Sequence, residues 1–438
     1  MNIVDIIAKK RDGAALSPDE VRHWIQGVVD GSIPAYQSTA LLMAIRIRGM
    51  TDGEAAVLTD AMAHSGAVFT PEDLGGFTVD KHSTGGVGDT TTLVLIPLLA
   101  AAGLTIGKLS GRALGHTGGT IDKLESIPGF RTKISREDFL AQVRRTGFAL
   151  ADHTADMVPA DTILYELRDV TATVDSLPLI VASIMSKKIA GGAQGIVIDV
   201  KTGAGAFLPE MEASRKLAQA LVSIGSKLGR KMAALITDMS QPLGRMVGNS
   251  LEVCEAIDTL RGDGPEDLTT LCCELGAELL LFAGKAKTRE EALKALDRLL
   301  RDGAAFAKLR ELVHEQGGNT GALEDGSLLP RASRRVEARI GKAGTVAALD
   351  ALAVGRAANL LGAGRRTAED DIDPAVGVEL LKKVGDVVAA NDAVALLHVN
   401  DEANLAEACK MVEDAYEIDE TGTAHEPPPL VLERILGD

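Results

Sequence analysis

The chain has 438 residues, of which 46% are hydrophobic, and this length predicts two or three domains rather than a single core. Aspartate and glutamate outnumber lysine and arginine by 62 to 46, which argues against a nucleic-acid groove but is compatible with a local basic pocket. The cysteines have no metal-ligand spacing and are expected to be reduced core residues of a cytoplasmic protein; they are Cys254, Cys272, Cys273 and Cys409.

The first part of the chain is predicted to be helical. Ser17 and Thr51 each stand three residues before a glutamate, Glu20 and Glu54, which is capping-box spacing ahead of helices over 21–29 and 55–63. The apolar run 40–45 between them is typical of a buried helix. No basic region precedes an apolar run at the N-terminus, so no signal peptide is expected.

Glycine and proline in residues 66–76 indicate a crossing into an α/β part. Strand-like runs at 77–81, 104–109, 148–151, 195–200 and 232–236 alternate with amphipathic helices, which predicts a parallel sheet. Residues 90–107 carry no charge, but Pro97, Gly103 and several threonines favour a buried helix and strand over a membrane span.

Two loops rich in glycine and hydroxyl residues flank this uncharged segment. Residues 81–89 read Lys-His-Ser-Thr-Gly-Gly-Val-Gly-Asp, and residues 110–125 read Ser-Gly-Arg-Ala-Leu-Gly-His-Thr-Gly-Gly-Thr-Ile-Asp-Lys-Leu-Glu. Either loop alone is a weak signal, because many such loops are only tight turns. Together, at the carboxyl edge of a parallel sheet, they would gather backbone N–H groups around an anion. Neither has P-loop or dinucleotide spacing, so the pair predicts a phosphate site without nucleotide hydrolysis or hydride transfer.

Both loops closely resemble the signatures of the thymidine and pyrimidine-nucleoside phosphorylase family. The resemblance continues through residues 165–176 and 199–207, covers nearly the whole chain, and is nearest to the bacterial pyrimidine-nucleoside phosphorylases. It implies reversible phosphorolysis of pyrimidine nucleosides to free base and α-D-(deoxy)ribose 1-phosphate, with inversion at the anomeric carbon. Inorganic phosphate would be the co-substrate, and no covalent nucleophile would be needed.

The fold class that follows is α/β. The resemblance implies a small all-α domain over 1–66 and 161–193, and a parallel-sheet α/β phosphate-binding domain over 75–160 and 194–330. A C-terminal α+β domain would cover 335–438. Residues 334–349 and 384–399 contain β-like runs, and residues 419–429 are expected to be an irregular tail before a final apolar turn.

The resemblance also assigns site residues. His82 would lie near a carbonyl of the base and donate a proton or a hydrogen bond to it. From spacing alone, Arg168 would instead pair with a neighbour such as Asp169, Lys187 would be solvated, and His82 would only orient its loop. The predicted catalytic residues are His82, Arg168 and Lys187, the pyrimidine-binding residues are Arg168, Ser183 and Lys187, and the phosphate-binding residues are Lys81, Ser83, Thr92, Lys108, Ser110 and Thr120.

Bacterial members imply a bound K⁺ as well. Backbone oxygens with one carboxylate suit a hard monovalent cation, although Glu255 on its own reads equally as an ordinary surface residue of a helix. Met246 replaces a smaller family residue, which matters little if only its carbonyl is used. The matching positions are Gly88, Thr90, Leu243, Met246 and Glu255.

Substrate breadth depends on Lys108, because family members that accept uridine tend to carry lysine there, where it could contact the 2′-hydroxyl. We therefore expect activity on uridine, thymidine and deoxyuridine. Ala113 stands where the family usually has glycine. The alternatives are a thymidine-selective phosphorylase, a catalytically silent pyrimidine-binding scaffold, and an anthranilate phosphoribosyltransferase, whose chain lacks the C-terminal domain. Family members are usually homodimers through the helical domain, and their cleft closes during the reaction.

Overall fold

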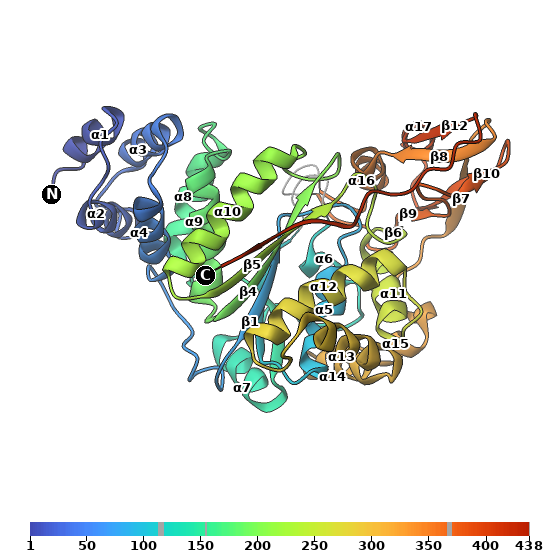
Figure 1. Cartoon of the computed structure of the whole chain (residues 1–438), viewed down its shortest axis with the longest axis horizontal. Helices are drawn as coiled ribbons and strands as arrows, with labels where there is room; N and C mark the ends of the chain where they lie inside the picture. Colours follow the sequence, from blue (N-terminus) through green and yellow to red (C-terminus); the bar gives the residue numbers. More distant parts are fainter. Residues whose placement is uncertain (113–117, 154–155, 366–369, 438) are drawn as a thin grey trace.

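Three groups of elements follow one another along the long axis of the molecule, with the N-terminal helices at one end and the C-terminal domain at the other (Figure 1). The structure is a computed structural model that describes residues 1–112, 118–153, 156–365 and 370–437. Ala113 lies outside these described residues. The expected fold class is confirmed, with a helical part, an α/β part built on parallel strands, and a C-terminal α+β part.

The helical group forms where the sequence supplies its own caps. Ser17 and Thr51 each accept a hydrogen bond from the backbone of the glutamate three residues on, and that glutamate bonds back, so both predicted capping boxes are confirmed. Proline at the second position of α9 sets its start. The helices are α1 Ile3–Arg11, α2 Pro18–Val29, α3 Ala35–Arg48, α4 Asp52–Ala63, α8 Pro159–Asp169 and α9 Leu177–Ala190.

The central sheet holds the predicted parallel strands. β1 (Val79–Ser83), β4 (Gly195–Thr202) and β5 (Lys231–Asp238) pair in parallel, and a parallel bridge from Thr78 to Thr105 joins them to the pair β2 (Ile106–Ser110) and β3 (Phe148–Asp152). The chain end adds β13 (Val431–Leu436), antiparallel to β5. The expectation of a final apolar turn was therefore wrong, because this segment is an edge strand.

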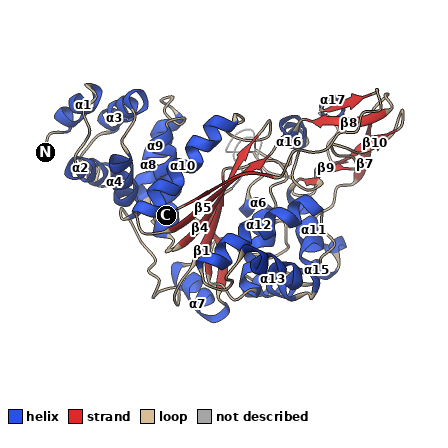
Figure 2. Cartoon of the chain, viewed as in Figure 1, coloured by secondary structure: helices blue, strands red, loops and turns tan. Residues whose placement is uncertain are grey.

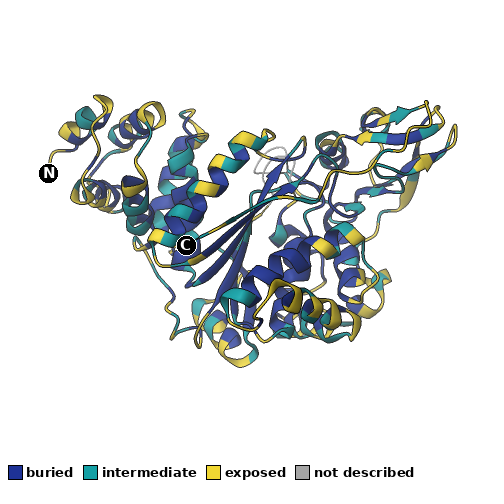
Figure 3. Ribbon diagram, viewed as in Figure 1, coloured by how far each residue is buried: buried dark blue, intermediate teal, exposed yellow. Residues whose placement is uncertain are grey.

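Helices cover both faces of the sheet, so β4 is buried throughout and β5 is buried at every position except its two ends (Figure 3). Alternation along β4 sends Ile196 and Ile198 towards α10 (Met211–Lys227) and Val197 towards α5 (Thr91–Ala101) and α12 (Glu266–Phe282). The uncharged helix α5 is buried along nearly its whole length. The remaining α/β elements are α6 Thr120–Glu125, α7 Arg136–Thr146, α11 Asn249–Leu260, α13 Arg289–Arg301, α14 Ala304–Glu315, α15 Gly321–Glu324 and a 3₁₀ turn at Gly326–Leu328.

In its described residues, the C-terminal domain combines short antiparallel strands with two helices (Figure 2). Two strands connect it to the α/β part: β6 (Met246–Val247) pairs with β9, and β13 returns to β5. Within the described residues, no helix is both long and apolar enough to cross a membrane. The elements of this domain are β7 Arg334–Arg339, β8 Gly344–Leu349, α16 Ala351–Leu360, β9 Gly377–Leu380, β10 Val387–Val388, β11 Ala393–Val399, α17 Leu405–Asp414 and β12 Tyr416–Asp419.

Candidate active site

A cavity of about 540 Å³ lies at the carboxyl ends of β1 and β2, where residues of α8 and α9 face the two glycine loops. This is the edge of a parallel sheet at which α/β folds bind ligands. The polar and charged residues that line it are His82, Ser83, Thr84, Asp89, Thr92, Lys108, Ser110, Arg112, Thr120, His153, Tyr165, Lys187 and Lys188.

Successive side chains of β1 point to opposite faces of the sheet, so Lys81 lies on a different face from Lys108 and Lys188. Lys81 points to the α5 face, where its ammonium contacts the Thr91 hydroxyl and lies 3.8 Å from Asp89 Oδ1. It is 1% exposed and does not line the cavity. Lys81 therefore places a buried positive charge beneath the first loop.

Asp80 and His82 point to the opposite face, towards α9. Asp80 joins two lysines from different parts of the chain, with Oδ1 3.1 Å from the Lys108 ammonium and Oδ2 2.9 Å from that of Lys188. Burial opposes ionisation of Asp80, but the two ammonium groups outweigh it and lower its pKa to about 2. Burial lowers the pKa of Lys108 to about 7 although Asp80 is beside it. This cluster carries a net positive charge at the floor of the cavity.

Two neutral histidines complete this wall. Burial, together with Lys188 and Lys108, holds the pKa of His82 well below its usual range. Burial and the ammonium groups of Lys188 and Lys187 lower the pKa of His153 to about 3. Near neutral pH each ring therefore offers one N–H donor and one acceptor nitrogen.

A buried network supports the loops from behind. The Ser83 hydroxyl donates to Asp89, and the Lys123 ammonium donates to the backbone carbonyl of Asp89 at 2.8 Å. Lys123 also forms a buried ion pair with Glu252 of α11 at 2.5 Å, and Glu252 accepts from the Thr90 hydroxyl at 2.9 Å. The first loop, α6 and α11 are thus held together by one set of charges.

The predicted pyrimidine-binding residues lie on α8 and α9. Arg168 donates to the main-chain carbonyls of Thr173, Val174 and Leu179, and it does not line the cavity. Lys187 lines the cavity and forms an ion pair with Asp161 at 2.5 Å. Ser183 is 3.5 Å from the Lys187 ammonium but, like Arg168, does not line the cavity.

The residues predicted to hold a cation gather behind the first loop. Gly88 has φ 68°, and a Cβ built there would lie 2.4 Å from the Leu243 carbonyl oxygen and 3.1 Å from that of Met246. Glu255 accepts backbone hydrogen bonds from Arg245 and Met246 on Oε1, while its Oε2 is buried without a hydrogen-bond partner. Burial raises the pKa of Glu255 to about 8. Carbonyls and an unsatisfied carboxylate oxygen fit a hard cation.

Thr90, the remaining member of that set, donates its hydroxyl to Glu252. The alternative of a surface position for Glu255 is wrong, because this residue is only 4% exposed.

Several predicted site residues line the cavity, and most of these belong to the two glycine loops or their flanks; they are His82, Ser83, Thr92, Lys108, Ser110, Thr120 and Lys187. Sequence reasoning did not predict His153 and Lys188, which line the cavity, or the charged residues that form ion pairs beside it; these are Asp80, Lys123, Asp161 and Glu252. One signal was available: charged residues within or beside apolar strands and helices, such as Asp80 and Lys188, must find partners once buried.

Three family models match successive parts of the chain. They describe a glycosyl transferase family helical bundle domain over residues 4–66, a glycosyl transferase family a/b domain over 75–306, and a pyrimidine nucleoside phosphorylase C-terminal domain over 345–419. A solved anthranilate phosphoribosyltransferase from Thermus thermophilus has a TM-score of 0.58 at 18% identity, over 71% of this chain and 98% of its own. That likeness shows a shared fold.

Curated relatives are similar over nearly the full length. A pyrimidine-nucleoside phosphorylase of Staphylococcus haemolyticus is 49% identical over 100% of both chains. Those of Geobacillus stearothermophilus and Bacillus subtilis are 51% and 50% identical, covering 92% and 94% of this chain and 93% and 95% of their own. The chain therefore belongs to the pyrimidine-nucleoside phosphorylase family.

Proposed function

We propose that this protein catalyses the reversible phosphorolysis of pyrimidine nucleosides to the free base and α-D-ribose or deoxyribose 1-phosphate. The observation that carries the proposal is the cavity at the strand ends, where two glycine loops face the cations of α9. Such a site can hold an anion on one side of the sugar and stabilise a departing anionic base on the other. Identity of about half the residues to curated phosphorylases over their full length supports the same reaction.

In the proposed reaction, an oxygen of phosphate bonds to the anomeric carbon as the bond from that carbon to the pyrimidine nitrogen breaks. The configuration at this carbon is thereby inverted. Phosphate would be held by Ser83, Thr92, Lys108, Ser110 and Thr120, which line the cavity, with the charge of Lys81 beneath the loop. Binding both reactants in one closed site would contribute to the rate enhancement by orienting them.

The electron pair of the broken bond between the anomeric carbon and the pyrimidine nitrogen passes to the pyrimidine ring. The enzyme must therefore stabilise negative charge on the base. Lys187 lines the cavity as an ammonium group, and His82 lines it as a neutral imidazole. We infer that His82 donates a hydrogen bond rather than a proton to the carbonyl of the base, because its lowered pKa leaves it uncharged. Arg168 and Ser183 would join them when the cleft closes.

We also propose that Gly88, Thr90, Leu243, Met246 and Glu255 hold K⁺. The buried, unpartnered Oε2 of Glu255 and the approach of two carbonyls to Gly88 support this assignment. A bound monovalent cation would favour the ionised form of Glu255 and fix the first glycine loop. No step of the reaction passes through it.

The deciding experiment measures uracil or thymine release from uridine, deoxyuridine, thymidine and cytidine, each with and without phosphate. We expect phosphate-dependent release from the first three and none from cytidine. A uridine rate near background beside rapid thymidine turnover would assign the thymidine-selective alternative. Absence of release from every nucleoside would favour the silent scaffold.

A cytoplasmic homodimer through the helical group is part of the proposal. Exposed apolar side chains on the first and third helices support it: Val4 is 53% exposed, Tyr36 73% and Ile47 70%. A helix face of this kind is typical of a subunit interface. Light scattering on wild type and Ile47→Asp tests the assignment, with a dimer expected for the first and a shift towards monomer for the second.

A further inference from the structure

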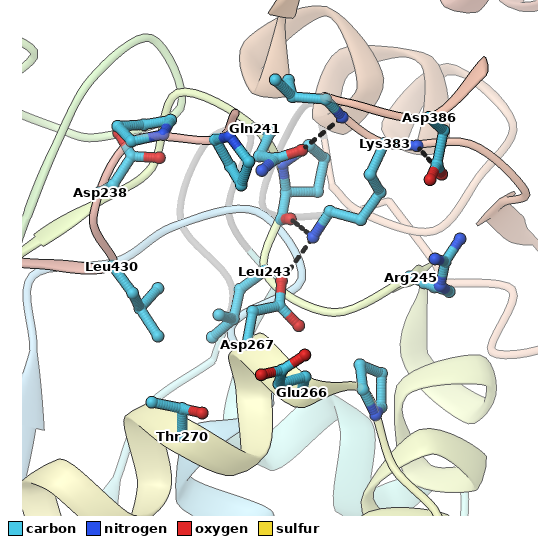
Figure 4. A pocket seen from close by; sticks show the side chains of 15 residues that line it. Asp238, Gln241, Leu243, Arg245, Glu266, Asp267, Thr270, Lys383, Asp386 and Leu430 are labelled. Atoms are coloured by element: carbon cyan, nitrogen blue, oxygen red, sulfur yellow. Dashed lines mark hydrogen bonds and ion pairs between the residues drawn. The ribbon is translucent and has the colours of Figure 1, made fainter. Parts of the chain in front are cut away.

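A second cavity, of about 510 Å³, separates the α/β part from the C-terminal domain (Figure 4). Lys383, in the turn after β9, lies on its wall and reaches across to the α/β part. Its ammonium donates to the carbonyl oxygens of Pro242 at 2.8 Å and Gly244 at 2.9 Å, and pairs with Asp267 of α12 at 2.5 Å. The Lys383 side chain is 12% exposed.

The segment it holds is the loop 241–247. Neighbouring contacts hold the same loop: Val384 donates its N–H to the Gln241 side chain at 3.2 Å, and Leu380 donates its N–H to the Arg245 carbonyl at 2.7 Å. The loop is therefore shaped jointly by its own domain and by the C-terminal domain.

The carbonyls of this loop point to two sides. Those of Pro242 and Gly244 face Lys383, whereas that of Leu243, between them, faces Gly88 on the opposite side. The N–H of Gly244 donates to the Asp267 carboxylate at 3.1 Å, and the carbonyl of Gly244 accepts from Lys383. Both backbone groups of Gly244, which follows Leu243, are therefore held. A peptide held on both flanks cannot rotate freely, and the Leu243 carbonyl keeps its direction.

We propose that Lys383 is a positioning residue for the monovalent cation, holding the Leu243 carbonyl towards Gly88 and Glu255 from the C-terminal domain. The inference rests on the cation site proposed above. Asp267 balances the charge of the ammonium, so Lys383 can shape the loop without a net charge that would repel the cation. Residues that orient metal ligands typically change metal affinity by roughly ten- to hundredfold when substituted.

The test compares Lys383→Met with Lys382→Met in the full chain. Lys382 is the matched control, because its ammonium donates to Val387 at 2.9 Å within the C-terminal domain. The temperature of unfolding is recorded against K⁺ concentration, with choline chloride keeping the ionic strength constant, since a ligand of the folded state raises stability with its saturation. We expect the K⁺ concentration for half-maximal stabilisation to rise roughly tenfold or more in K383M and to stay unchanged in K382M.

The possible outcomes separate the two proposals. A wild-type protein whose unfolding temperature ignores K⁺ would overturn the cation site and the role of Lys383 with it. A responsive wild type with the same half-saturation in K383M would overturn only the role of Lys383. If K383M does not fold, Lys383→Gln, which keeps an N–H donor for the carbonyls, replaces it; its half-saturation must rise by a smaller factor, and an unchanged value overturns the inference.

Discussion

The neutral state of His82 has a direct consequence for stability against acid. Its pKa lies well below the usual value near 6.5, so below that pH the unfolded chain binds a proton that the folded protein does not. The contribution of His82 to stability therefore falls as the pH drops from 7 to 5, by at most about 1.4 kcal/mol for each pH unit.

His82→Gln should lose correspondingly less over the same interval. Urea unfolding of both proteins at pH 7 and pH 5 measures the difference, from which His153 cancels because both proteins contain it. Equal acid sensitivity in the two would contradict a neutral His82.

The lowered pKa of Lys108 predicts that phosphate binding depends on pH. With a pKa of about 7, its ammonium loses its proton in the free enzyme as the pH rises from 7 to 9, so the KM for phosphate should increase over that range. Lys108→Met removes the charge at every pH, and we expect about a tenfold higher KM at pH 7 with a flatter profile. Initial rates at varied phosphate from pH 6 to 9 check this. The second ionisation of phosphate is common to both proteins, and parallel profiles would show that Lys108 does not contact phosphate.

Sequence patterns predicted the residues of the glycine loops because hydroxyls, glycines and lysines there are adjacent in the chain. They did not predict Asp80 as the partner of Lys108 and Lys188, since burial and three-dimensional proximity create that cluster. Arg168 shows the reverse: its motif indicates a ligand-binding cation, while its guanidinium donates to three nearby carbonyls.

At the scale of helices and strands, the features that could be predicted were those determined by residues adjacent in the sequence. The capping boxes at Ser17 and Thr51 set helix starts within a few residues, and the uncharged run of α5 could only be buried. The edge strand β13 was missed because its structure depends on pairing with β5, far away in the chain, and on no signal within its own residues.

Arg434 connects strand β13 to helix α12 through ion pairs, and we expect these pairs to stabilise the fold. It pairs with Glu274 and Glu278 of α12, which are buried. Arg434→Ala would leave Glu278 without its ion-pair partner, while Glu274 would keep its pair with Arg289. We expect a loss of about 2 kcal/mol in unfolding free energy, less than for a fully buried pair because Arg434 is partly exposed. Arg215→Ala is the control, since it breaks the more exposed pair with Glu433 and should cost less than about 1 kcal/mol. A loss in Arg434→Ala as small as the one expected for Arg215→Ala would show that the buried carboxylates do not depend on Arg434.

At the scale of the whole molecule, the two halves of the site sit on different groups of elements. The glycine loops belong to the α/β part, while Lys187 and Ser183 lie on α9 of the helical group. The ion pair between Asp80 and Lys188 joins the two groups beside the cavity, but Arg168 and Ser183 do not line it. A pyrimidine that contacts both residues therefore requires a movement of the helical group or of their side chains.

Closure of the helical group onto the α/β part is the movement that would also exclude water from the reacting sugar. We expect phosphate and uracil together, a pair that cannot react, to reduce the radius of gyration measured by small-angle X-ray scattering. Phosphate alone should produce a smaller change, because the residues proposed to bind it all belong to the α/β part. The matched control is Lys187→Met, which removes the cation that faces the base from α9; it should reduce the compaction caused by uracil while leaving the response to phosphate. An unchanged radius in wild type with both ligands would mean that Arg168 and Ser183 reach the base by side-chain rearrangement or do not contact it.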